Sequence, residues 1–136
     1  MTVKSSIARV TAKTSYWFLR NILHRGGTSL PGKLAVSIDP DILKTIQQDF
    51  DLIIVTGTNG KTLTTALITR VLQAGGYQVI TNTSGSNMIQ GITGTLVTTK
   101  VKKSPNGKKP LAVLEVDEAN VEKITAAIQP KMFVLT

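Results

Sequence analysis

The stretch DLIIVTGTNGKTLTTALITRVLQA, residues 51–74, constrains the fold more than any other part of the chain. It passes from an apolar run to a helical pattern through a bend that contains two glycines, an asparagine and a lysine. A short continuous apolar run is typical of a parallel strand that is buried on both faces. Apolar residues then recur at helical spacing, at Leu63, Ala66, Leu67, Val71 and Ala74. The stretch therefore predicts a strand and a helix that are joined by a tight loop.

The same alternation continues to the last residue. Further strands are predicted over YQVIT (77–81), LAVLEVD (111–117) and KMFVLT (131–136), and helices over NMIQGITGTLVTT (87–99) and EANVEKITAAIQ (118–129). Repeated strand-helix-strand units predict an α/β fold in which helices cover a parallel sheet. Because the last strand reaches Thr136 without a turn or a polar tail, we expect the sheet to be incomplete in this chain.

The N-terminal segment has a different pattern. From Val3 to Ile22, apolar residues recur near helical spacing and basic residues lie mostly off that stripe, which predicts an amphipathic helix. A glycine-rich linker follows, so we divide the chain into residues 1–28, helix and linker, and residues 29–136, the α/β domain. Two uses of the helix stay open at this point: packing on its own domain, or lying on an anionic membrane surface.

Composition narrows the class of protein. A chain of 136 residues with 41% apolar residues fits one globular domain, and the absence of cysteine excludes disulfides and thiolate metal clusters and fits a cytoplasmic protein. The net charge of +8 raises the question of nucleic acid. However, the lysine-rich run KVKKSPNGKKP (100–110) has turn residues and no aromatic side chain for a base to stack on. We predict a solvated loop there and no nucleic-acid partner.

The loop after the first strand has the chemistry of a phosphate site. Its predicted residues are Gly57, Thr58, Asn59 and Gly60, whose backbone amides would meet the positive end of the helix dipole and form a cradle for an anion. Lys61 can reach the β and γ phosphates of a nucleotide, and the Thr62 hydroxyl can bind Mg²⁺. The general pattern GxxxxGK[ST] needs a glycine at position 55, where this chain has Val55.

An acidic group is expected beside this loop. Glu115 and Asp117 end the predicted strand 111–117, and the carboxyl ends of parallel strands share one edge of a sheet. We predict Glu115 as a ligand of Mg²⁺, and Asp117 as the cap of the helix that follows.

The stretch TGTNGKT (56–62) resembles the ATP-binding loop of the Mur ligase superfamily, which has valine or another non-glycine residue at the first position of the pattern. Three further stretches narrow the resemblance to the MurT family, the Mur-ligase-type subunits of lipid II isoglutaminyl synthases: LPGKLAVSIDPDIL (30–43), ITNTSGSNMIQGI (80–92) and LEVDEA (114–119). The chain departs from the family pattern at Leu63, where threonine is usual, and at Thr83, where arginine is common.

The resemblance implies the ATP-binding central domain of a Mur ligase, in incomplete form, and a particular reaction. ATP would phosphorylate the α-carboxylate of D-glutamate in the lipid II stem peptide, and ammonia from a GatD-type glutaminase partner would convert the acyl phosphate to D-isoglutamine. Lys61 would stabilise charge on the transferring phosphoryl group, while Thr62 and Glu115 would hold Mg²⁺. Asn82 and Asn87 are candidates for substrate contact, with a turn role as the alternative.

The resemblance also sets limits and alternatives. The zinc ribbon and C-terminal domain of the family are not expected in these residues, so we expect this chain alone to bind ATP weakly and not to turn over. An amino-acid-adding Mur or folylpolyglutamate-type ligase is the alternative enzyme, although serines usually follow the glutamate there and Val116, Asp117 and Glu118 follow it here. A non-catalytic nucleotide-binding module is the alternative from another class. We expect the protein to act in the cytoplasm. Because the implied substrate is bound to the membrane, we also expect peripheral contact with the inner face of the plasma membrane.

Overall fold

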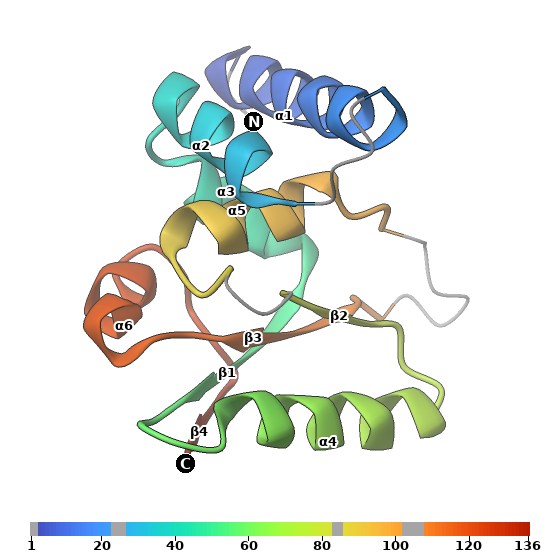
Figure 1. The fold of residues 1–136 in the computed structure, drawn as a ribbon, viewed down its shortest axis with the longest axis vertical. Coiled ribbons are helices and arrows are strands. Elements are labelled where there is room, and N and C mark those ends of the chain that lie inside the picture. The colour runs from blue at the N-terminus through green and yellow to red at the C-terminus, as the bar shows by residue number, and fades with distance from the viewer. Residues whose placement is uncertain (1–2, 23–26, 83–85, 102–107) are drawn as a thin grey trace.

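The computed structural model describes residues 3–22, 27–82, 86–101 and 108–136, and it alternates helices and strands from β1 onward (Figure 1). The helices are α1 (Val3–Asn21), α2 (Ser29–Ile38), α3 (Ile42–Ile46), α4 (Lys61–Ala74), α5 (Ile89–Thr98) and α6 (Glu118–Thr125), with a 3₁₀ helix η1 (Gln47–Asp49) after α3. The strands are β1 (Asp51–Thr56), β2 (Val79–Thr81), β3 (Leu111–Glu115) and β4 (Met132–Leu135).

The four strands form one sheet in the order β2-β3-β1-β4, and every pair is parallel. In the register, Asp51 lies opposite Leu111 and Ile54 lies opposite Phe133. The predicted parallel α/β fold is therefore confirmed. Because all strands run the same way, the residues that follow β1, β2 and β3 emerge at one edge of the sheet.

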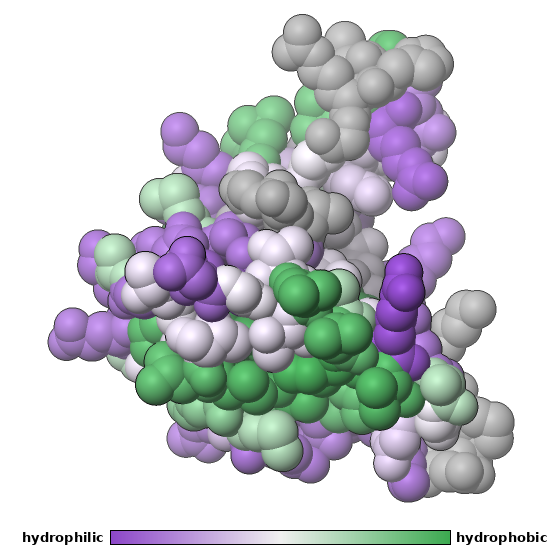
Figure 2. Space-filling view, turned by 60° about the horizontal axis from the view of Figure 1, so that its bottom comes forward, coloured by the Kyte–Doolittle hydropathy of each residue, from purple (hydrophilic) through white to green (hydrophobic). Residues whose placement is uncertain are grey.

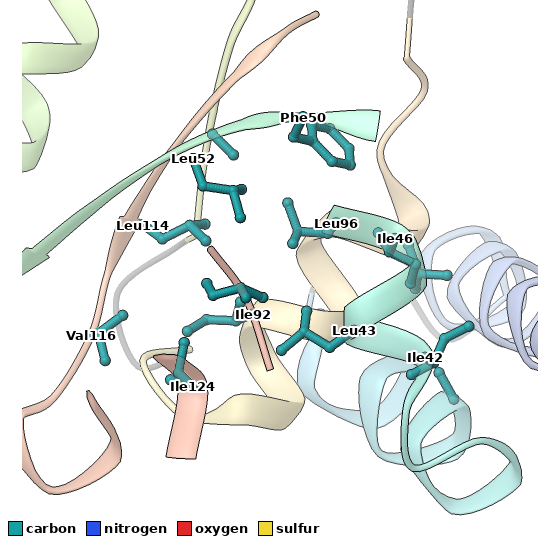
Figure 3. Packing of buried hydrophobic residues seen from close by; sticks show 14 of the residues in the cluster. Ile42, Leu43, Ile46, Phe50, Leu52, Ile92, Leu96, Leu114, Val116 and Ile124 are labelled. Carbon is teal, nitrogen blue, oxygen red and sulfur yellow. The ribbon is translucent and has the colours of Figure 1, made fainter. Parts of the chain in front are cut away.

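The larger core covers one face of this sheet. Strand side chains alternate between faces, so Leu52 and Ile54 of β1 point to one side and Ile53 and Val55 to the other. On the first side, residues from α3, α5 and α6 pack against strand residues such as Leu114 of β3 (Figure 3); the helix residues include Leu43, Ile46, Ile92, Leu96 and Ile124. These six side chains are at most 2% exposed, and burial of this kind contributes roughly 1.5–3 kcal/mol for each large aliphatic side chain.

Helix α2 is a helix that the sequence patterns did not predict. Its proline and glycine interrupt the helical pattern of the sequence, but Pro31 lies in the first turn, where a missing amide costs little. Gly32 faces α5, and a Cβ atom there would lie 1.7 Å from the carbonyl oxygen of Gln90. A Cβ atom at Gly94 of α5 would meet the carbonyl oxygen of Thr28 at the same distance. The glycines therefore allow two helix backbones to touch.

Helix α1 lies against α2 and α5 (Figure 1), and small side chains make up its buried face. Ser5, Ala8 and Ala12 are fully buried, and the guanidinium of Arg9 donates to Asp49 at 2.9 Å. The helix is confirmed over nearly the predicted range, but its apolar stripe points away from the domain. The division of the chain at residue 28 stays a prediction.

The other face of the sheet is covered only in part. Helix α4 packs there on Ile53, Val55 and Val113 through Ile68 and Leu72. Figure 2 shows an apolar band across the face to which α4 and β4 belong. Large side chains exposed on these two elements are Leu63, Leu67, Val71, Met132, Phe133 and Leu135.

Among the described residues, no helix is long and apolar enough to cross a membrane. Parts of two predictions lie outside the described residues: the middle of the lysine-rich loop, 102–107, and Thr83.

Candidate nucleotide site

The loop between β1 and α4 has the backbone geometry of an anion cradle. Gly57 has a φ of 137° and Gly60 a φ of 80°, which are left-handed values that favour glycine. Gly60 is the residue before α4, and its carbonyl accepts the first helical bond from Thr64 at 2.9 Å. The amides that follow therefore have no partner within the helix and lie at its positive end.

Gly57 is also constrained by its neighbour across the loop. A Cβ atom at this position would lie 2.1 Å from the carbonyl oxygen of Thr136. Thr136 supports the loop further, because its amide donates to Thr56 at 2.9 Å and its hydroxyl to the carbonyl of Asn59 at 2.6 Å. The loop shape thus depends on the residue after β4 as well as on its own glycines.

Lys61 lies in the first turn of α4, and its ammonium group points back over the loop. It donates to the carbonyl oxygen of Gly57 and lies 3.6 Å from the Glu118 carboxylate. The pKa of Glu118 is lowered, mainly by the hydrogen bond from its own backbone amide. Partial loss of solvent raises this pKa, whereas the positive charge of Lys61 and a hydrogen bond from the Thr58 side chain lower it further. The Gly57 carbonyl and the Glu118 carboxylate therefore hold Lys61 beside the cradle. A bound phosphate would compete with both for the Lys61 ammonium group, and its negative charge would repel that of Glu118.

Glu118 was not predicted as part of the site. Its position in the first turn of α6, three residues after the strand end at Glu115, was the available signal, because that turn lies at the same edge of the sheet as the loop. Asp117 occupies the N-cap position of α6, as predicted, but its side chain makes no capping hydrogen bond.

Thr62 and Glu115 are in direct contact. The Thr62 hydroxyl is 3.0 Å from each carboxylate oxygen of Glu115, which is 5% exposed. Adjacent oxygen ligands of an octahedral Mg²⁺ with bonds of about 2.1 Å lie about 3.0 Å apart, so this pair has the chemistry and the separation of two such ligands. No group of three or more His, Cys, Asp or Glu residues that could hold a metal ion occurs in the described part of the chain. Mg²⁺ commonly binds one or two carboxylates together with waters and phosphate oxygens.

Asn82 and Asn87 surround Glu115. The side-chain nitrogen of Asn82 donates to the backbone carbonyl of Glu115 at 2.8 Å, and the side-chain oxygen of Asn82 accepts from the backbone amide of Glu115 at 2.8 Å. The side-chain nitrogen of Asn87 donates to the Glu115 carboxylate at 3.1 Å. Asn82 is 5% exposed, so these bonds replace strand pairing just beyond the end of β2. Substrate contact by the two asparagines stays a prediction; the structure adds a supporting role toward Glu115 that the sequence did not indicate.

The fold is similar to that of two solved ligases. Over 76% of the chain it is similar to MurF from Acinetobacter baumannii, with a TM-score of 0.58 and 17% sequence identity. A UDP-N-acetylmuramoylalanyl-D-glutamyl-2,6-diaminopimelate--D-alanyl-D-alanyl ligase from the same species gives a TM-score of 0.55. The architecture is thus that of the Mur ligases, as predicted from the resemblance.

Curated relatives specify the family. The chain is 45% identical over all 136 residues to the MurT subunit of the glutamine-hydrolysing lipid II isoglutaminyl synthase of Streptococcus pneumoniae. It is 39% identical over 111 residues, 81% of the chain, to the MurT subunit from Staphylococcus aureus strain COL. The chain belongs to the MurT family. It spans 29% and 24% of the lengths of these two relatives. No family model matches the sequence.

Proposed function

We propose that the chain is the ATP-binding part of a MurT-type ligase subunit that acts in the cytoplasm. The Thr62–Glu115 contact beside the β1–α4 loop is the observation that supports this most, because it joins a hydroxyl and a carboxylate from distant parts of the sequence at a glycine loop. The amides from Thr58 to Thr62 would bind the phosphates. Lys61 would exchange its contact with Glu118 for one with the β and γ phosphates.

The proposed reaction is the amidation of D-glutamate in the lipid II stem peptide. Transfer of the γ-phosphoryl group of ATP to the α-carboxylate gives an acyl phosphate and ADP. Ammonia attacks the acyl carbon, and phosphate leaves to give D-isoglutamine. A GatD-type glutaminase would supply the ammonia, since the MurT relatives are named as subunits of a glutamine-hydrolysing synthase.

The chain's own residues would bind and orient the nucleotide in this scheme. Lys61 would stabilise negative charge on the transferring phosphoryl group. Thr62 and Glu115 would hold Mg²⁺, which neutralises charge between the phosphates when it is bound. Asn82 and Asn87 would fix Glu115, because they bind its backbone and its carboxylate.

Calorimetric titration with ATP and Mg²⁺ tests the nucleotide site. We expect weak binding by the chain, and a loss of at least about tenfold in affinity for Lys61→Ala, since a charge-assisted contact is removed. Lys123→Ala, which removes the same charge from the exposed surface of α6, should bind as the unchanged chain does. Equal affinity of all three proteins, or no binding by a folded chain, would contradict the proposed site.

The ligase reaction is tested on the longer protein that the MurT relatives represent, together with its glutaminase, lipid II, glutamine and ATP. Isoglutamine formation with ammonia as the nitrogen donor is the expected result. A product that contains an added amino acid would instead favour the amino-acid-adding class, to which the fold is also similar.

A further inference from the structure

The outward face of α1 is apolar although the helix lies at the outside of the molecule. Val3, Val10 and Trp17 follow one another at intervals of seven residues and are 78%, 65% and 59% exposed. Ile7 and Phe18 lie beside this line and are 53% and 47% exposed. A surface helix ordinarily places such residues against the core, so this face lacks its usual cover.

The inner face explains why the stripe points outward. Ser5, Ala8 and Ala12 let α1 approach α2 and α5 closely, and the Arg9–Asp49 ion pair fixes the rotation of the helix about its axis. Turning the large apolar side chains inward would displace these small ones and break that ion pair. The stripe is therefore a fixed feature of the fold.

A groove continues the apolar surface beside the stripe. It has a volume of about 570 Å³ and lies between α1 and the start of α2, where Val10, Phe18, Leu19 and Leu30 line it. The exposed apolar area is thus wider than one row of side chains.

The charges of α1 indicate what would cover this face. The helix has four basic residues and no acidic one: Lys4, Arg9, Lys13 and Arg20. Arg9 is paired with Asp49, whereas Lys13 and Arg20 are exposed along one flank of the stripe and Lys4 along the other. An apolar stripe between basic flanks, with a tryptophan in it, suits the boundary between anionic headgroups and acyl chains.

We propose that α1 docks on an anionic bilayer surface, with Val3, Ile7, Val10, Trp17 and Phe18 inserted and Lys13 and Arg20 against the headgroups. This rests on the proposed function in one respect: a ligase whose substrate is lipid II works at a membrane surface. The helix lies on the bilayer and does not span it, and it brings the domain to that surface.

Trp17 is the only tryptophan in the chain, so its fluorescence reports on this face alone. Vesicles of phosphatidylcholine with phosphatidylglycerol should shift its emission to shorter wavelength, and brominated acyl chains should quench it. Vesicles of phosphatidylcholine alone should bind at least about tenfold more weakly, because the attraction of the basic residues is lost.

Two double variants divide the contributions. Ile7→Ser with Val10→Ser removes exposed apolar area, and Lys13→Gln with Arg20→Gln removes charge; each should weaken binding to anionic vesicles about tenfold or more. The matched control is Leu67→Ser with Val71→Ser, which removes similar exposed area from α4 and should leave vesicle binding unchanged. All these side chains are exposed, so circular dichroism should show folded proteins.

Three results would overturn the proposal. One is unchanged Trp17 emission when anionic vesicles are added to the folded chain. Another is loss of binding in the α4 variant but not in the α1 variants. The third is a dimer, dissociated by the Ile7 and Val10 substitutions, whose Trp17 is already shielded without lipid. Lys61→Ala should bind vesicles normally, so a failure of the nucleotide site and a failure of membrane docking are distinguishable.

Discussion

Lys61 is the central residue of the candidate site. Its ammonium group already contacts two groups, and a bound phosphate would compete with both for it. The Gly57 carbonyl accepts from it, and the Glu118 carboxylate lies 3.6 Å away. This arrangement keeps the Lys61 side chain over the loop, but it also places the negative charge of Glu118 close to the expected phosphate position. Glu118 is half exposed, so water screens its charge in part.

Removing that charge should strengthen nucleotide binding. We expect Glu118→Gln to raise the affinity for ATP about two- to fivefold, the size of a partly exposed ion-pair contribution. Glu122→Gln, one turn later on α6, is the matched control and should change nothing. Titration calorimetry measures both, and weaker binding by Glu118→Gln would mean that Glu118 assists the nucleotide instead of opposing it.

The pH dependence of this difference follows from the pKa of Glu118. The pKa lies below its ordinary value of 4.5, so the carboxyl stays charged from neutral pH down to about pH 5. The difference between Glu118→Gln and the unchanged chain should persist over that range. It should narrow in more acidic solution, where the glutamate is protonated and resembles glutamine. A difference that disappears already at neutral pH would assign the effect to another group.

Asn82 is the residue that holds Glu115 in place. We expect Asn82→Ala to lower the free energy of unfolding by about 2–4 kcal/mol, because it leaves two buried backbone groups of Glu115 without partners. Urea unfolding measures this loss. The control Asn21→Ala removes an exposed asparagine and should cost under about 1 kcal/mol. Binding of ATP by Asn82→Ala should also respond less to Mg²⁺, which a purely structural role distant from the site would not cause.

At the scale of elements, the sequence predicted what local patterns determine. The strand β1, the loop and α4 follow from an apolar run, glycines and helical spacing within 24 adjacent residues. The position of Glu115 beside the loop followed from the rule that the carboxyl ends of parallel strands share an edge, whereas its direct contact with Thr62 was seen only in the structure. Helix α2 could not be predicted, because a glycine in a local pattern indicates a turn. Gly32 instead leaves room for the backbone of α5, which lies far away in the sequence. The pairing of Lys61 with Glu118 likewise depends on the distance in space between the first turns of α4 and α6, which the sequence pattern does not give.

The α2–α5 contact makes a test at this scale. An alanine at Gly32 would favour the helix by about 1 kcal/mol in open space, but here its Cβ meets the Gln90 carbonyl and must push the helices apart. We expect Gly32→Ala to lower the free energy of unfolding by about 1–3 kcal/mol in urea titrations. Lys33→Ala, an exposed neighbour in the same helix, should be nearly neutral. Stabilisation by Gly32→Ala would show that the two helices are not in contact in solution.

Over the described residues of this chain, the two sides of the sheet are covered unequally. One face is covered by α3, α5 and α6, with α1 and α2 packed behind them, whereas α4 is the only described helix on the other (Figure 1). Strand β4 lies at the edge of the sheet, and three of its four side chains are exposed and apolar: Met132, Phe133 and Leu135. An exposed apolar edge strand is a ready partner for another chain.

We therefore expect the chain to associate with itself as its concentration rises, through the face of α4 and β4. Leu67→Lys with Phe133→Lys should keep it monomeric in sedimentation experiments at concentrations where the unchanged chain is a mixture, because a charge cannot be buried in an apolar contact without a partner. Both side chains are more than half exposed, so folding should be unaffected. The matched control is Ile7→Lys with Val10→Lys on α1, which adds the same charge at another exposed apolar site and should leave the association unchanged. If only this α1 variant became monomeric, the self-contact would lie on α1 and not on the face of α4 and β4.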